Sequence, residues 1–144
     1  MKILSLLIAL TLSAAATGCA KKSLAPESVP LDRVECARCR MLISTDIGGG
    51  QIVSADDDTR FYDDIGCLAA DWRARPGHGR AFVRIASGGW SDAVDASFAR
   101  PAAVATAMGS GIVAFALAAD ARAADREGRA LTFDEVVRTS GAPE

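Results

Sequence analysis

LAADWRARPGHGRA at residues 68–81 and LAADARAADREGRA at residues 117–130 are two versions of one stretch of sequence. They match at nine of fourteen positions, with a constant offset of 49 residues and no gap. Alanine alone does not explain the match, because aspartate, arginine and glycine recur at the same places. A repeated segment of this kind indicates that one supersecondary unit occurs twice in the chain.

The first copy predicts a helix with strands on both sides. Asp64 is a residue type that caps helices, and four apolar residues follow it at helical spacing: Ile65, Leu68, Ala69 and Trp72. Residues 51–55 and 60–62 are strand candidates before this helix, and residues 80–86 alternate as a closing strand.

The second copy predicts the same order of elements. Strand candidates cover 92–97 and 112–116, a helix covers 117–126 and stops near Gly128, and a last strand covers 130–133. Strands joined by short glycine turns favour an antiparallel or mixed sheet. The sequence therefore predicts an α+β fold, in which two similar strand-strand-helix-strand halves, about 48–87 and 88–138, form one compact domain.

The N-terminus has the pattern of a lipoprotein signal peptide. Lys2 precedes an apolar run over 3–12, and small residues lead directly to Cys19. We expect 1–18 to be removed, Cys19 to be lipidated, 19–32 to be the lipidated cysteine with a flexible tether, and 33–144 to be the folded domain. This predicts a lipid-anchored protein on the periplasmic face of a bacterial membrane, with the outer membrane favoured over the inner one.

Charge and cysteine content limit the function. Removing 1–18 leaves an acidic chain with a net charge near minus 3, so nucleic acid is not expected as a partner. Once Cys19 carries lipid, three cysteines remain, namely Cys36, Cys39 and Cys67. Three thiols cannot all pair within one chain, and a bound metal explains an unpaired thiol in an oxidising compartment.

Cys36, Cys39 and Met41 form a Cys-x-x-Cys-x-Met cluster. Thiolate and thioether sulfurs favour Cu(I), so the methionine shifts the expectation from zinc toward copper. Two alternatives stay open at this point, and in both of them Met41 only fills space in the core. The cysteine pair is then either a thiol-disulfide redox pair or half of a site in a zinc-stabilised interaction domain.

Both alternatives lack part of their usual pattern. A thioredoxin-like redox protein carries its Cys-x-x-Cys at a helix start within a βαβ unit, and no such unit precedes Cys36. Zinc takes four ligands, and Cys67 with His78 is a poor second pair. His78 is the one histidine of the chain, so no hydrolytic constellation is predicted and the protein is not expected to be an enzyme.

Five short motifs together resemble the nitrous oxide reductase accessory lipoprotein family, NosL. They are CARCRM at 36–41, FYDD at 61–64, GCL at 66–68, AMGS at 107–110 and LTFDE at 131–135. The resemblance implies a Cu(I)-binding lipoprotein built of two strand-strand-helix-strand halves. It also implies a metallochaperone that delivers Cu(I) to the nitrous oxide reductase apoprotein, alongside an ABC-transporter-type assembly complex in the membrane.

The resemblance also implies the copper ligands. The family motif is Cys-x-x-Cys-Gly-Met, which assigns Cys39 and Met41, and a later Met-Gly pair assigns Met108 as the distant ligand. Further candidates are Cys36, Cys67 and His78, although His78 matches no family position. Arg40 replaces the family's glycine, so the loop is expected to lose a conformationally permissive residue.

Overall fold

Residues 24–141 are described by the computed structural model, so the predicted signal peptide and Cys19 lie outside the described residues. The strands are β1 (Gly50–Val53), β2 (Arg60–Tyr62), β3 (Arg80–Arg84), β4 (Trp90–Asp92), β5 (Ser97–Ala99) and β6 (Val113–Phe115). The helices are α1 (Ile65–Ala74), α2 (Ala118–Ala124) and α3 (Phe133–Thr139). No helix within residues 24–141 is long and apolar enough to cross a membrane.

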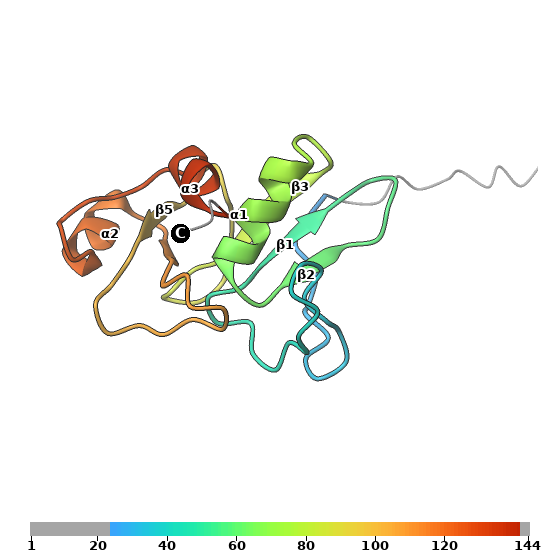
Figure 1. Ribbon diagram of the computed structural model, residues 1–144. Coiled ribbons are helices and arrows are strands. Elements are labelled where there is room, and N and C mark those ends of the chain that lie inside the picture. Colours follow the sequence, from blue (N-terminus) through green and yellow to red (C-terminus); the bar gives the residue numbers. More distant parts are fainter. Residues whose placement is uncertain (1–23, 142–144) are drawn as a thin grey trace, which may run out of the picture.

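Two antiparallel sheets organise the molecule (Figure 1). The larger sheet has the order β2-β1-β3-β4, and the smaller pairs β5 with β6. Every residue of β1 is buried, as expected of a central strand packed between two neighbours. The α+β class expected from the sequence is confirmed, with antiparallel pairing throughout the named strands.

Helix α1 packs against β1, β2 and α3, and most of its first seven residues are buried in the core. Its N-cap is Asp64, as predicted, and the Asp64 carboxylate accepts a hydrogen bond of 2.6 Å from the backbone N–H of Gly66. The helix ends before Pro76, because a residue that precedes proline disfavours the helical conformation.

Two strands expected in the second half are wrong. Only the ends of the expected strand at 92–97 are strand residues, in β4 and β5, and 93–96 form the turn between them, where the Asp92 side chain accepts a hydrogen bond from the N–H of Val94. Residues 130–133 keep only an isolated bridge between Leu131 and Phe98. The helix after β6 is present but shorter than the predicted 117–126.

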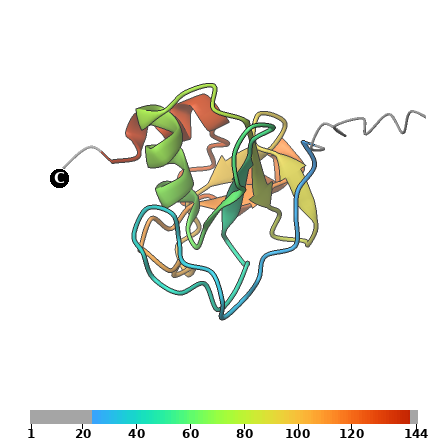
Figure 2. The same cartoon turned by 90° about the vertical axis from the view of Figure 1, so that its right-hand side faces the viewer.

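Helix α3 was not predicted, and it occupies the end of the expected last strand. Thr132 and Glu135 form a capping box, in which each side chain accepts a hydrogen bond from the other residue's backbone N–H. Figure 2 shows α3 beside α1. Phe133 of α3 stacks near Trp72 of α1 and Phe98 of β5, with ring centroids 5.8 and 6.0 Å apart. This aromatic chain joins the two halves.

The described end of the expected tether is held against the domain. The side-chain amide of Gln51 accepts from the N–H of Glu27 at 2.8 Å and donates to its C=O at 2.9 Å. Gln51 is fully buried, so these bonds satisfy a polar group inside the core. Glu27 is therefore part of the folded structure.

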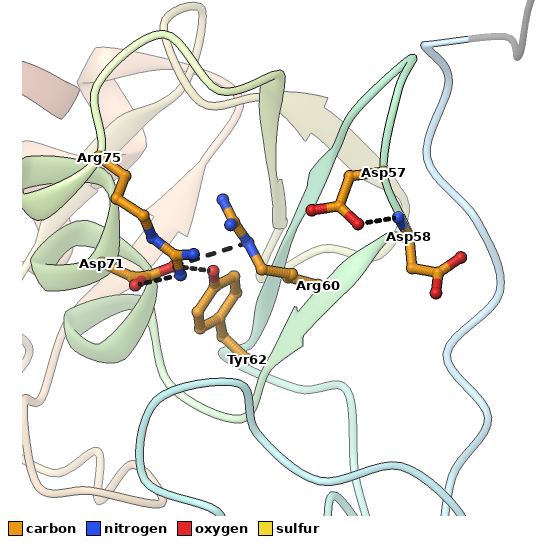
Figure 3. A network of polar contacts seen from close by, with 6 residues as sticks. All are labelled: Asp57, Asp58, Arg60, Tyr62, Asp71 and Arg75. Atoms are coloured by element: carbon orange, nitrogen blue, oxygen red, sulfur yellow. Dashed lines mark hydrogen bonds and ion pairs between the residues drawn. The ribbon is translucent and has the colours of Figure 1, made fainter.

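A buried carboxylate ties β2 to α1 on the side shown in Figure 3. Asp71 accepts a hydrogen bond from the hydroxyl of Tyr62 and two, both of 2.8 Å, from Arg75. Arg60 adds an ion pair at 3.7 Å. Burial opposes ionisation of Asp71, but the hydrogen bonds from Tyr62 and Arg75 and the two arginine charges outweigh it and lower the pKa of this carboxyl.

This network predicts a pH-dependent effect of Asp71→Asn. Because the pKa of Asp71 is lower in the folded protein than in the unfolded chain, its carboxylate stabilises the fold above about pH 4, and that contribution is lost as the pH falls further. The substitution should cost about 2 kcal/mol at pH 7 and progressively less below about pH 4. Urea unfolding at several pH values measures this difference.

Asp95→Asn provides the matched control, because Asp95 lies exposed in the turn before β5. It should change stability by less than about 0.5 kcal/mol at every pH. A constant cost of Asp71→Asn from pH 7 to pH 3 would contradict a role for the ionised carboxylate.

Candidate metal centre

A tight hairpin presents the Cys-x-x-Cys pair. The N–H of Cys36 donates to the C=O of Met41 at 2.8 Å, and the N–H of Arg40 donates to the C=O of Cys36 at 3.0 Å. Arg40 has a φ of 66°, the left-handed conformation that glycine adopts without cost and other residues adopt at about 1–2 kcal/mol. An ion pair of 2.8 Å with Glu35 lies across the turn. Arg40 thus takes up the backbone conformation that a glycine would allow.

This hairpin docks on the segment between β2 and α1. The N–H of Ala37 donates to the C=O of Phe61 at 2.9 Å, which brings the hairpin beside Asp63 and the first turn of α1. As a result four potential ligand atoms gather, from Cys36, Cys39, Asp63 and Cys67, all within 4.8 Å of one another. The three cysteines are free thiols.

The four potential ligands differ in how deeply they are buried. Cys36 has no exposed surface and lies in the hydrophobic core, while Asp63 and Cys67 are also buried. Cys39 is half-buried, and its thiol donates to Asp63 at 3.3 Å. The cluster therefore has a closed inner side at Cys36 and a more open side at Cys39.

The four groups determine one another's protonation. A hydrogen bond from Cys67 lowers the pKa of the Cys36 thiol to about 4, although burial opposes ionisation there. The same hydrogen bond, together with burial, raises the pKa of Cys67. Burial raises the pKa of Cys39 to about 11 and the pKa of Asp63 to about 6. The Cys36 thiolate thus accepts a hydrogen bond from the Cys67 thiol, and a bound cation would displace the protons of Cys67 and Cys39.

Asp64 connects this cluster to the loop that carries Met108. Its fully buried carboxylate accepts hydrogen bonds from the hydroxyl of Thr106 at 2.6 Å and from the N–H of Met108 at 3.0 Å, in addition to its helix cap. The loop approaches so closely that a Cβ on Gly66 would lie 2.7 Å from the Cβ of Ser110. Asp64 therefore holds the Met108 loop over the start of α1.

The two predicted methionine ligands lie at the surface. Met41 is 52% exposed and Met108 is 46% exposed. Met108 and Cys67 line one surface pocket of about 250 Å³, so the structure places a thioether and a buried thiol on the same walls. Met41 follows the hairpin turn and is paired through its backbone with Cys36.

His78 is not brought to the cluster. It lies in the turn between α1 and β3, where it lines a different pocket with Asp56, Asp57 and Arg60. Asp63, in contrast, was not among the residues expected to bind metal. Its spacing of four residues before Cys67, across the start of a predicted helix, is the signal that would have placed both groups on one side of that helix turn.

The donor set suits two kinds of ion. Three thiols with one carboxylate match the four-coordinate geometry of Zn²⁺, and the sulfur majority also suits Cu(I), which binds soft donors. Met108, which lines one pocket with Cys67, offers a thioether that favours Cu(I), because zinc sites in proteins are built from thiolate, imidazole and carboxylate groups.

No family model matches the chain, and no curated protein matches it. Among solved structures, the chain is similar to the crystal structure of the copper chaperone NosL from Shewanella denitrificans, with a TM-score of 0.65 and 21% sequence identity. The match covers 81% of this chain and 96% of that chain. The NosL resemblance expected from the sequence motifs is therefore confirmed for the fold.

Proposed function

We propose that this protein is a Cu(I) metallochaperone and not an enzyme. In this proposal it is a lipoprotein on the periplasmic face of a bacterial membrane. It delivers Cu(I) to the nitrous oxide reductase apoprotein during assembly of that enzyme's copper centres, together with an ABC-transporter-type complex in the membrane.

The observation that carries the proposal is the convergence of Cys36, Cys39 and Cys67 beside Asp63. These residues come from two segments of the chain that a backbone hydrogen bond between Ala37 and Phe61 holds together. The solved structure with the same fold is that of a copper chaperone, which supports the choice of copper as the cargo.

The geometry also suits transfer of a metal. The inner thiols would hold Cu(I) with charge neutralisation, while Met108 would offer a neutral thioether at the solvent side. A thioether binds without losing a proton, so a recipient's sulfur can enter the coordination sphere before the thiols leave. We place Cys67 and Met108, which line one surface pocket, at the exchanging side, with Met41 as a second surface thioether.

Zinc binding is the second candidate, and Asp63 is the observation that favours it. Its carboxylate adds a hard donor to the three thiols and completes a set of four ligands, which the sequence alone did not provide. In that case the protein would be a zinc-stabilised interaction domain, and its methionines would not contribute to binding.

An anaerobic titration of the reduced soluble domain distinguishes the two candidates. We expect one Cu(I) per monomer, a first coordination shell of sulfur by X-ray absorption, and no displacement of Cu(I) by equimolar Zn²⁺. Displacement by zinc, or a shell dominated by nitrogen and oxygen, would rule out the copper proposal.

The membrane anchor has a separate test. We expect the Cys19→Ala protein to appear in the soluble periplasmic fraction, because it lacks the lipidated residue, while its domain still binds Cu(I). A Cys19→Ala protein that is still processed and membrane-bound would contradict lipidation at this position.

A further inference from the structure

One surface pocket has features that the copper ligands alone do not explain. It has a volume of about 250 Å³ and brings together the start of α1, the Met108 loop and the end of α3. Cys67 and Met108 provide soft sulfur donors on its walls. Arg38, Arg100 and Ser140 line the same pocket.

Two positively charged side chains, Arg38 and Arg100, line the pocket. Among residues 24–141, neither Arg38 nor Arg100 forms an ion pair. The acidic group in the lining, Asp64, is buried and already accepts hydrogen bonds from Gly66, Thr106 and Met108. The positive end of the α1 dipole points to the same region. Arg38 and Arg100 therefore offer charged contacts for the carboxylates of a ligand.

Ser140 adds an unused hydrogen-bonding group. Its hydroxyl oxygen is buried and has no hydrogen-bond partner within the described part of the chain, although the residue lines the pocket. An unpaired buried hydroxyl costs about 1–3 kcal/mol. Rotation of the Ser140 side chain toward the pocket would let a polar ligand relieve that cost.

We propose that this pocket binds a small anionic thiol, whose carboxylates contact Arg38 and Arg100 and whose sulfur reaches the metal beside Cys67. The inference rests on the proposed copper function. The volume lies below the usual 300–1,000 Å³ of ligand pockets, so it accommodates a molecule between cysteine and a short cysteinyl peptide in size.

The exchange step involves no oxidation. The sulfur of the incoming thiol forms a bond to Cu(I), and the bond between Cu(I) and the Cys67 sulfur breaks. The proton of the incoming thiol passes to the Cys67 thiolate, so charge and atoms balance. The anionic thiol would then carry Cu(I) to or from the protein, and Met108 would offer its thioether on the same pocket wall.

Binding without copper tests the pocket itself. S-methylglutathione keeps both carboxylates and cannot bind as a thiolate, so we would titrate it into the reduced, copper-free protein and follow backbone amide shifts. We expect saturable shifts at Cys67, Met108 and Ser140. Arg38→Gln and Arg100→Gln should each weaken binding about fivefold to tenfold, since each removes one charge-assisted contact.

Two variants separate a binding role from a structural one. Arg122→Gln removes an exposed arginine of α2 outside the pocket and should leave binding unchanged. Ser140→Ala should weaken binding about threefold while the ligand-free protein keeps or gains stability in urea, because it loses an unpaired buried hydroxyl. A loss of stability in Ser140→Ala without weaker binding would contradict our assignment of this hydroxyl.

The copper-loaded protein tests the exchange. Glutathione should accelerate Cu(I) release to a chelator saturably, and its diethyl ester, which keeps the thiol but lacks the carboxylate charges, should not. The proposal would be overturned if glutathione and its diethyl ester accelerated Cu(I) release equally. It would also be overturned if glutathione accelerated release equally from wild type and from the two arginine variants. If the protein binds no Cu(I), the proposed function fails, whereas the copper-free titration still shows whether the pocket takes an anionic ligand.

Discussion

Replacing Cys39 with alanine is expected to weaken Cu(I) binding by more than about a hundredfold. Loss of a residue that only supports a metal ligand already weakens metal binding by up to about a hundredfold, and Cys39 is itself a proposed ligand. Cys39 is the thiol on the open side of the cluster, and it bonds to Asp63 at 3.3 Å. Its loss removes one sulfur donor and leaves Asp63 without that contact. Competition with a Cu(I) chelator under anaerobic conditions measures the affinity.

Met108→Leu is the matched comparison, because leucine keeps the size of the side chain and removes only the thioether. It should weaken Cu(I) binding about tenfold and leave Zn²⁺ binding unchanged, since zinc gains little from a thioether. Copper affinity that survives both Cys39→Ala and Met108→Leu would place the metal elsewhere. Equal effects on copper and zinc would favour the zinc domain.

Asp64→Ala should destabilise the copper-free protein by roughly 3–7 kcal/mol. The substitution removes a helix cap, worth about 1 kcal/mol, and leaves the hydroxyl of Thr106 and the N–H of Met108 without their buried partner, at about 1–3 kcal/mol each. Urea unfolding of the reduced protein measures the loss. Amide exchange should also become faster over residues 106–110, because their anchor to α1 is gone.

Thr132→Ala isolates the capping contribution. Thr132 caps α3 at an exposed position, and it makes no hydrogen bond to another loop in the part of the chain that is described. We expect a cost of about 1 kcal/mol. If Asp64→Ala costs no more than Thr132→Ala, then Asp64 is an ordinary cap and does not hold the Met108 loop.

Local signals predicted the first half of the fold well. Asp64 could be recognised as a cap because a short polar side chain precedes an apolar stripe at helical spacing, and β2 contains two adjacent strong strand formers, Phe61 and Tyr62. These features depend on neighbouring residues in the sequence. Tertiary contacts did not change them.

The second half shows why the repeat was an incomplete guide. Residues 129–130 of the second copy correspond to 80–81 of the first, where a strand begins, and this correspondence suggested a strand at 130–133. Thr132 and Glu135 instead start a helix through their capping box. That signal was present in the sequence and outweighed the similarity between the copies. The helix of the second copy was retained, because the conserved part of the repeat lies there.

The metal cluster could be predicted only in part. Cys36 and Cys39 form a local motif, whereas their meeting with Asp63 and Cys67 depends on the hydrogen bond between Ala37 and Phe61, which no spacing rule contains. The same limit applies to the Met108 loop. A buried carboxylate 44 residues away anchors it.

The gradation of sulfur burial decides which oxidation products can form. Cys36 and Cys67 are shielded, so bulky disulfide-forming proteins cannot bring a sulfur in line with either thiol. The sulfurs of Met41 and Met108 meet solvent, as does part of the Cys39 side chain, and a thioether oxidises to a sulfoxide without forming a crosslink. Methionine sulfoxide is reversible by reductases, so oxidation of Met41 and Met108 is repairable, whereas Cys39 is the thiol open to crosslinking by an outside partner.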